Sequence, residues 1–346
     1  MALREVLLTG SVPLKPASAV FENVSRYLGD VVRRMPDGEQ LGWIQAIPPR
    51  IAKNEAFEPG RITRAGTVAM FANNRQTYRL KAGRRSMEVE LGPLGFAENI
   101  LDAYAQFHRM KQAGVIQPGV RLQATVAGPA SAGHVIDLPQ SELLPMMERH
   151  LAREIDAIVS GIPANDLAIQ LDLAVEVEKE EFDRRPDAFD TPSLALKDLT
   201  MEETASSTAR LADRVPRDVE LGIHLCALWH VDRGGGQDLN VHVDYANLLA
   251  RKIRRQIDYL HLPTTPEFSQ PDFEPLRRLA LHQGTKLFIG LLHAVDGLEG
   301  AKRRMTAARA VRRDFGVSHF CGLSQWGAGP ETVAPMLELH HATAAL

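Results

Sequence analysis

Short runs of apolar and β-branched residues alternate along the chain with longer segments whose apolar residues recur at helical spacing. Seven short runs predict β-strands, at Val6–Val12, Val120–Val126, Leu167–Val175, Val219–Leu228, Asp258–Leu262, Lys286–His293 and Gly316–Cys321. A weaker eighth strand is predicted at Val31–Pro36. Helices are predicted at Glu98–Ala113, Ser141–Ser160, Leu239–Ile257 and Gly297–Phe315. Repeated strand–helix units are typical of a parallel sheet covered by helices.

Eight parallel strands closed into a ring are the simplest arrangement of these units. We therefore predict an α/β fold, a single (β/α)8 TIM barrel over residues 1–346. An open doubly wound sheet is the alternative, but no Gly-x-Gly-x-x-Gly turn follows the first strand. Two segments interrupt the alternation. We predict an inserted hairpin or lid over the barrel mouth at Gln45–Leu91, and a second mouth loop at Glu178–Leu199.

The composition excludes several classes of protein. Hydrophobic residues make up 45% and charged residues 24% of the 346, which is typical of a globular chain and not of a disordered one. The net charge of −3 lacks the basic footprint of a nucleic-acid binder. No apolar run approaches a membrane span, and the first residues do not resemble a signal peptide. We expect a cytoplasmic protein with small-molecule partners, and the sequence is compatible with a homo-oligomer.

The two cysteines of the chain, Cys226 and Cys321, are each predicted to end a strand. His224 lies two residues before Cys226, and side chains two apart on a strand share a face. One imidazole and two thiolates, with a fourth position open, form the ligand set of a catalytic zinc site. His319 precedes Cys321 at the same spacing, so it is either a fourth ligand of a closed structural site or a core residue. The alternative is that both cysteines are buried small hydrophobes.

Polar residues at other predicted strand ends are candidates for substrate binding and catalysis. Asp172 lies where an apolar strand becomes a loop, and it either orders that loop or holds a substrate cation. Ser11 and Glu39 occupy similar positions and could instead be turn or cap residues. His293 ends another strand and is a candidate general acid, because histidine titrates nearest neutrality; a hydrogen-bonded core histidine is the alternative.

Six short motifs follow one another along the chain: Thr9–Pro13, Asp37–Glu39, Ala127–Ser131, Ile169–Asp172, His224–Cys226 and Cys321–Leu323. They resemble, in the same order, the Gly-Ser-Phe-Pro, Asp/His-Gly-Glu, Thr-Gly-Pro-Val-Thr, Ile-Gln-Ile-Asp, His-x-Cys and Asp-Cys-Gly-Leu motifs of the C-terminal catalytic barrel of cobalamin-independent methionine synthase. Uroporphyrinogen decarboxylase and the zinc-dependent methylcobalamin:coenzyme M methyltransferases are similar more distantly. The similarity runs over most of the chain.

The resemblance implies a zinc-dependent methyl- or alkyltransferase. In that family a histidine, two cysteines and a glutamate bind zinc, and the zinc activates a thiol substrate. The resemblance therefore implies Zn²⁺ on His224, Cys226 and Cys321. Ser11, Glu39 and Asp172 match positions that hold the amino-acid substrate in the synthases. The implied partners are a small-molecule thiol and an alkyl or methyl donor.

The sequence departs from the family at several positions. Pro263 falls where the zinc-binding glutamate is expected, and His261 or Glu267 could substitute for it. The Asp-Glu-Pro of the synthases is Asp172-Leu-Ala here, and their catalytic histidine aligns nearer Val295, two positions from His293. We expect no counterpart of the folate-binding N-terminal barrel of the long synthases. We therefore expect a thiol or methyl donor other than that of the folate-dependent reaction.

Two further functions are compatible with the sequence. A metal-free decarboxylase or lyase of the uroporphyrinogen decarboxylase type would use carboxylates and arginines to position an acidic substrate. A non-enzymatic scaffold stabilised by zinc would have a closed site with four protein ligands.

Overall fold

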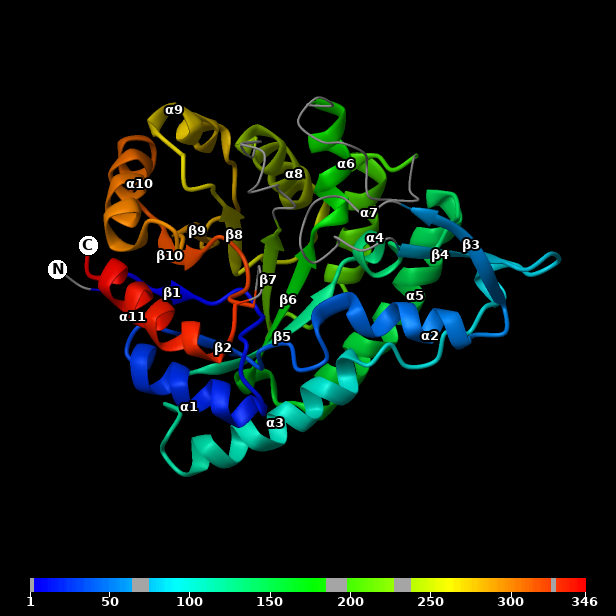
Figure 1. Cartoon of the computed structure of the whole chain (residues 1–346), viewed down its shortest axis with the longest axis horizontal. Coiled ribbons are helices and arrows are strands. Elements are labelled where there is room, and N and C mark those ends of the chain that lie inside the picture. Colours follow the sequence, from blue (N-terminus) through cyan, green and yellow to red (C-terminus); the bar gives the residue numbers. More distant parts are fainter. Residues whose placement is uncertain (1–2, 64–74, 185–197, 227–237, 325–327) are drawn as a thin grey trace.

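The computed structural model describes residues 3–63, 75–184, 198–226, 238–324 and 328–346. Eight parallel strands form its central sheet in the order β1-β10-β9-β8-β7-β6-β5-β2, and a parallel bridge between Val6 and Val32 joins the two end strands. The predicted (β/α)8 barrel is therefore confirmed (Figure 1). The strands are β1 (Val6–Leu7), β2 (Arg34–Pro36), β5 (Arg121–Ala127), β6 (Leu167–Leu173), β7 (Glu220–Leu225), β8 (Tyr259–Pro263), β9 (Lys286–Leu292) and β10 (Gly316–His319).

Helices surround the strands, because each has an apolar stripe that packs against the outer face of the barrel (Figure 1). They are α1 (Ala17–Leu28), α2 (Ile47–Lys53), α3 (Phe96–Gln112), α4 (Pro129–Ala132), α5 (Gln140–Gly161), α6 (Val175–Arg184), α7 (Met201–Ala212), α8 (Leu239–Lys252), α9 (Gln270–Phe273), α10 (Gly297–Val311) and α11 (Val333–Ala344). In the described chain no helix is both long and apolar enough to cross a membrane.

Several predicted boundaries need correction. The first strand, predicted to continue to Val12, ends at Leu7, and beyond it only an isolated bridge joins Ser11 to Gly38. Helices α8 and α10 end at Lys252 and Val311, several residues before the predicted ends, because the next residues turn to extended backbone that leads into β8 and β10. The apolar spacing continued past α8 because Ile253 and Ile257 remain in the core although they are not helical. The segment predicted as a mouth loop from Glu178 is helical as far as Arg184, in α6, and its remainder falls mostly outside the described residues.

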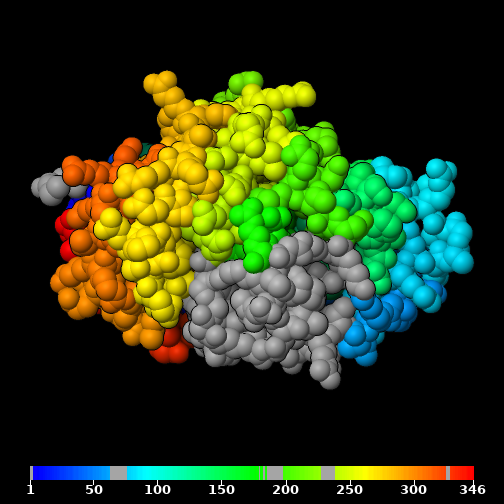
Figure 2. All heavy atoms as spheres, turned by 90° about the horizontal axis from the view of Figure 1, so that it is seen from above, coloured from blue at the N-terminus to red at the C-terminus, as the bar shows by residue number. Residues whose placement is uncertain are grey.

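The predicted insertion contains an antiparallel strand pair, β3 (Phe57–Thr63) and β4 (Arg75–Leu80), that is separate from the barrel sheet. The pair lies toward one end of the molecule, where β3 packs beside α2 (Figure 1). The view from above shows this part of the chain, in blue to cyan, at the same end (Figure 2). Tyr78 ties β4 to the loop after β5, since its N–H donates to the carbonyl of Val135 and its carbonyl accepts from the N–H of Asp137.

The barrel interior is filled in layers by alternate residues of each strand. On β7 these are Glu220, Gly222 and His224, followed by Cys226 beyond the strand end. Gly222 is required, because a Cβ there would lie 1.9 Å from the ring of Tyr259, which fills the middle layer. Below that layer Glu220 pairs with Arg34, which caps the amino-terminal end of the barrel. The inward positions nearest the carboxyl ends of the strands are left for polar side chains.

Candidate metal and substrate site

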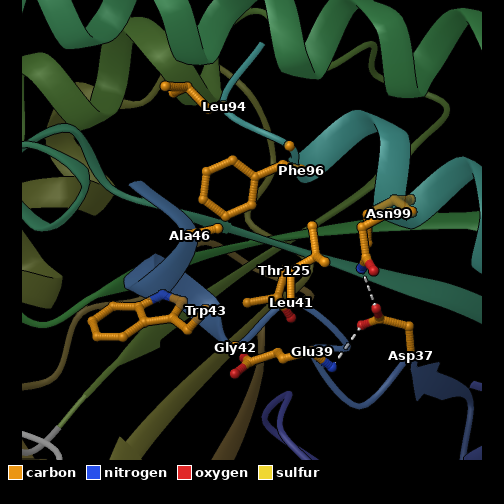
Figure 3. A pocket seen from close by; sticks show the side chains of 12 residues that line it. Asp37, Glu39, Leu41, Gly42, Trp43, Ala46, Leu94, Phe96, Asn99 and Thr125 are labelled. Carbon is orange, nitrogen blue, oxygen red and sulfur yellow. Dashed lines mark hydrogen bonds between the residues drawn. The ribbon is translucent and has the colours of Figure 1, made fainter. Parts of the chain in front are cut away.

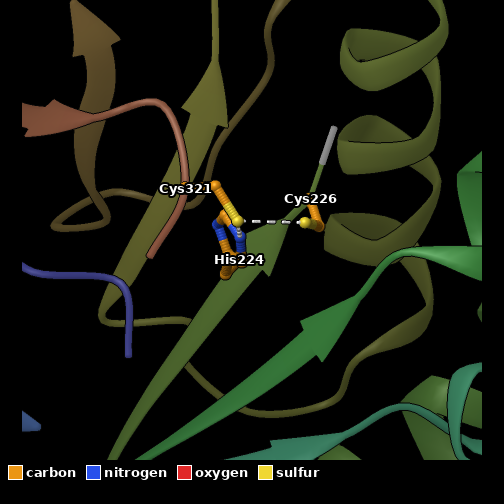
Figure 4. Close-up of side chains that lie close together, drawn as sticks. All are labelled: His224, Cys226 and Cys321. Carbon is orange, nitrogen blue, oxygen red and sulfur yellow. Dashed lines mark hydrogen bonds between the residues drawn. The ribbon is translucent and has the colours of Figure 1, made fainter. Parts of the chain in front are cut away.

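Three of the predicted metal ligands meet at the carboxyl-terminal end of the barrel. His224 lies on β7, Cys226 follows that strand directly, and Cys321 lies two residues beyond the end of β10. The two sulfurs are 3.3 Å apart, and Cys321 Sγ is 3.7 Å from His224 Nε2 (Figure 4). One ligand atom from each residue lies within 4.8 Å of the others, and all three side chains are buried. Two thiols and one imidazole in such a cluster match the donor set of a zinc site.

A second histidine fixes which nitrogen of His224 faces the thiols. His261 Nε2 lies 3.0 Å from the carbonyl oxygen of His319, and a carbonyl only accepts, so this nitrogen carries the hydrogen. In the neutral ring, His261 Nδ1 is then an acceptor for His224 Nδ1–H, at 2.7 Å. Burial lowers the pKa of His224 to about 3, so its ring is neutral at physiological pH. His224 Nε2 therefore carries a lone pair that faces the cysteines, where it accepts from the thiol of Cys321 at 3.7 Å.

Among the described residues, no fourth protein ligand reaches this cluster. Within the described ranges, no other His, Cys, Asp or Glu offers an atom that joins the group of three. His261 and His319, both predicted as possible fourth ligands, have other partners: His261 supports His224, and His319 Nδ1 donates to the carbonyl of Cys321 at 2.9 Å. Glu267, the third candidate, is exposed in the loop after β8. His261 also points into the barrel, but its two ring nitrogens are bonded to His224 and to the carbonyl of His319, so neither is left for a metal.

Asp172 lies next to His224 in the barrel wall. Strands β6 and β7 pair in register at these two residues, and Asp172 Oδ1 lies 4.0 Å from His224 Nε2. The side chain is buried, and this oxygen has no hydrogen-bond partner among the described residues. Burial raises the pKa of Asp172 well above its usual range, and the neighbouring Cys321 and Glu39 raise it further. A buried carboxyl group with no partner for its charge fits a site for a substrate cation, because the cation would favour its ionised form.

Glu39 and Ser11 also lie at the carboxyl-terminal end of the barrel, and each side chain packs closely against a glycine there. Glu39 Oε1 lies so close to Gly10 that a Cβ there would be 2.2 Å from it. Ser11 Oγ would be 2.0 Å from a Cβ on Gly322, the residue after Cys321. Burial raises the pKa of Glu39, and the nearby Asp37 and Cys321 raise it further. The predicted substrate residues therefore border the cysteine cluster.

His293 follows β9 and is buried beside the cluster without being part of it. Its ring is stacked parallel on that of Phe320, the residue before Cys321, with centroids 5.1 Å apart. Thr264 Oγ1 lies 3.5 Å from its Nε2. Burial lowers the pKa of His293 well below its usual range, and the positive charge of Arg304 adds to that effect. A neutral imidazole must first take up a proton before it can act as a general acid. The role of general acid for His293 therefore stays a prediction.

A pocket beside Glu39 was missed from the sequence. The space between its lining atoms is about 370 Å³, a volume that includes open solvent, and only a small part of it is wide enough for a water molecule. Trp43 and Phe96 face it from two separate segments, and Thr125 and Glu39 line its floor (Figure 3). Asp37 is held at its edge, where Asn99 donates to the carboxylate at 2.5 Å. No local pattern marks Trp43 or Phe96 as neighbours; only the Asp-Gly-Glu motif pointed to this place.

Comparisons with known proteins find similarity at the level of structure only. No protein-family profile matches the chain, and no curated protein sequence matches it. A Listeria monocytogenes protein, named as a candidate vitamin-B12-independent methionine synthase, superposes with a TM-score of 0.55 at 14% identity, covering 94% of this chain and 86% of that one. A B12-independent methionine synthase from Shewanella sp. W3-18-1, in complex with selenomethionine, superposes with a TM-score of 0.56 at 12% identity, covering 99% and 97%. These likenesses confirm the predicted resemblance in fold.

Proposed function

We propose that this protein is a zinc-dependent enzyme that transfers a methyl or other alkyl group to or from a small-molecule thiol. The observation that carries the proposal is the buried cluster of His224 Nε2, Cys226 Sγ and Cys321 Sγ, with no fourth protein ligand among the described residues. Zinc held by three protein ligands keeps a position for a substrate, and a thiol bound there is deprotonated at neutral pH.

The remaining residues of the site would bind and orient the substrate. Asp172 and Glu39 are buried or half-buried carboxylates with no arginine or lysine ion-paired to them among the described residues, so each is suited to a substrate ammonium group. Ser11, beside Gly322, would fix the polar end of the thiol substrate through its hydroxyl and backbone. His293 would exchange a proton with the substrate through its imidazole ring, which is stacked on Phe320 beside Cys321.

The two alternative functions have less support. A decarboxylase acting on an acidic substrate needs cationic side chains, whereas Asp37, Glu39 and Asp172 concentrate acidic groups around this site. A scaffold stabilised by zinc needs a closed set of four ligands. His261 and His319, which would complete such a set, are bonded to other groups.

Metal analysis of the purified protein tests the proposal directly. We expect about one equivalent of zinc per chain after zinc supplementation, and its loss in Cys226→Ser and in Cys321→Ser. His150→Gln is a matched control, because His150 is also buried but bonds the carbonyl of Val89 far from the barrel mouth. Less than a tenth of an equivalent of zinc in the wild type, or full occupancy in both serine variants, would overturn the proposal.

A further inference from the structure

The pocket beside Glu39 holds the only strained non-glycine backbone in the part of the chain that the structure describes. Glu39 has a φ of +55° and Trp43 a φ of +33°, and both residues line this pocket. Such conformations cost free energy, and they persist where the surrounding structure fixes a side chain for function. The two strained residues, Glu39 and Trp43, contribute an acidic and an aromatic side chain to the lining of the same pocket (Figure 3).

The lining combines aromatic faces with acidic groups. Trp43 and Phe96 supply two rings, and Asp37 and Glu39 supply two carboxyl groups. Arg50 packs against Gly95 at the edge, but the lining contains no basic residue. Aromatic faces next to a carboxylate are the arrangement that binds methylated ammonium groups, because ring quadrupole and negative charge both attract a cation that cannot donate hydrogen bonds.

Two polar atoms of the pocket lining, Trp43 Nε1 and Thr125 Oγ1, have no hydrogen-bond partner among the described residues. Thr125 is 5% exposed, and its Oγ1 lies on the floor of the pocket. A buried hydroxyl without a partner is costly, so it marks a position where a bound molecule or water completes the bonding. A hydroxyl on the occupant, as choline has, or a water beside a purely methylated cation would complete the bonding.

The pocket adjoins the cysteine cluster through two close contacts. The Glu39 carboxylate, in the pocket lining, lies against Gly10, and the next residue, Ser11, lies against Gly322 beside Cys321. A molecule held against Glu39 is thus close to a thiol held at the cysteines. The pocket and the cluster provide two neighbouring sites, as a transfer between two substrates requires.

We propose that this pocket binds the alkyl donor, and that the donor is a methylated onium cation, either a quaternary ammonium or a tertiary sulfonium compound. The identification as donor rests on the proposed function, whereas the binding itself does not. In the transfer, a lone pair of the substrate thiolate sulfur forms the new C–S bond. The C–N⁺ or C–S⁺ bond of the donor breaks and leaves its electron pair on the departing nitrogen or sulfur. A neutral amine or thioether results, and no oxidant or reductant is consumed.

Calorimetric titration tests the binding without relying on activity. Choline and its neutral isostere 3,3-dimethylbutan-1-ol are titrated into the wild type, and we expect choline to bind at least about tenfold more tightly. Trp43→Leu and Glu39→Gln should each weaken choline binding about tenfold, while Trp43→Phe, which keeps an aromatic face, should retain most of it. Glu88→Gln, an exposed acid outside the pocket, is the control and should bind choline as the wild type does. Equal binding of the two isosteres by the wild type would overturn the proposal even if a variant failed to fold.

Further arms separate this inference from the proposed function. Choline should bind Cys226→Ser as tightly as the wild type, since the pocket does not contain that residue. If the protein binds zinc but does not prefer choline to 3,3-dimethylbutan-1-ol, only the onium pocket is overturned. If it prefers choline but binds no zinc, only the proposed function is overturned. Tetramethylammonium and trimethylsulfonium, each with a ¹³C-methyl label, are then incubated with the zinc-loaded protein and 2-mercaptoethanol. A labelled methyl thioether from one of them identifies the donor class, and no product from either would overturn the role as donor.

Discussion

Replacing His261 should weaken zinc binding although His261 is not placed as a ligand. His261 accepts the Nδ1–H of His224 at 2.7 Å and donates to the carbonyl of His319 at 3.0 Å, and it is fully buried. In His261→Ala, both partners lose their hydrogen bonds, and His224 can protonate either ring nitrogen. Loss of such a supporting partner typically weakens metal binding about 10- to 100-fold, which corresponds to about 1.4–2.8 kcal/mol.

Competition for zinc against a chromophoric chelator measures this effect, and urea unfolding of the metal-free protein measures the accompanying loss of stability. Two orphaned buried groups are expected to lower the free energy of unfolding by about 2–6 kcal/mol. His150→Ala is the matched control, because it removes a buried histidine that bonds a backbone carbonyl remote from the site. It should lose stability without losing zinc affinity. An unchanged zinc affinity in folded His261→Ala would refute the reasoning, since the tautomer of His224 would then not depend on His261.

Three further outcomes are expected. Asp172→Asn should stabilise the metal-free protein by about 1–3 kcal/mol at pH 8 and have little effect at pH 3. The pKa of Asp172 is raised in the folded protein, so above the pKa of the unfolded chain the cost of ionising the buried carboxyl lowers the free energy of unfolding. Urea unfolding at both pH values measures this, and an equal effect at each pH would contradict it. Zinc should protect Cys226 and Cys321 together from maleimide labelling in the native protein, and mass spectrometry showing only one of them protected would argue against a shared ion. Gly222→Ala should lower the free energy of unfolding by about 1–3 kcal/mol through its clash with Tyr259, and an unchanged urea midpoint would show that the ring can move aside.

Part of the site could be predicted because barrel geometry converts a local pattern into a position. His224 and Cys226 share a face by the two-residue repeat of a strand, and any residue at the carboxyl end of a strand points to the same mouth. Strand geometry therefore brings five residues together at this end of the barrel, independently of the loops that connect the strands: His224, Cys226, Cys321, Asp172 and Glu39. The fourth-ligand candidates were harder to separate, because sequence spacing does not say which polar group already has a partner.

The sequence by itself determined the barrel and the three residues of the cysteine cluster. Apolar alternation fixed the strands, helical spacing fixed most of the helices, and the strand ends marked His224, Cys226 and Cys321. Only the tertiary structure decided that His261 supports His224 instead of facing the thiols, and that Trp43 and Phe96 form a pocket with Glu39. The physical reason is that these contacts join residues far apart in the chain, through hydrogen bonds and backbone strain that no local pattern records.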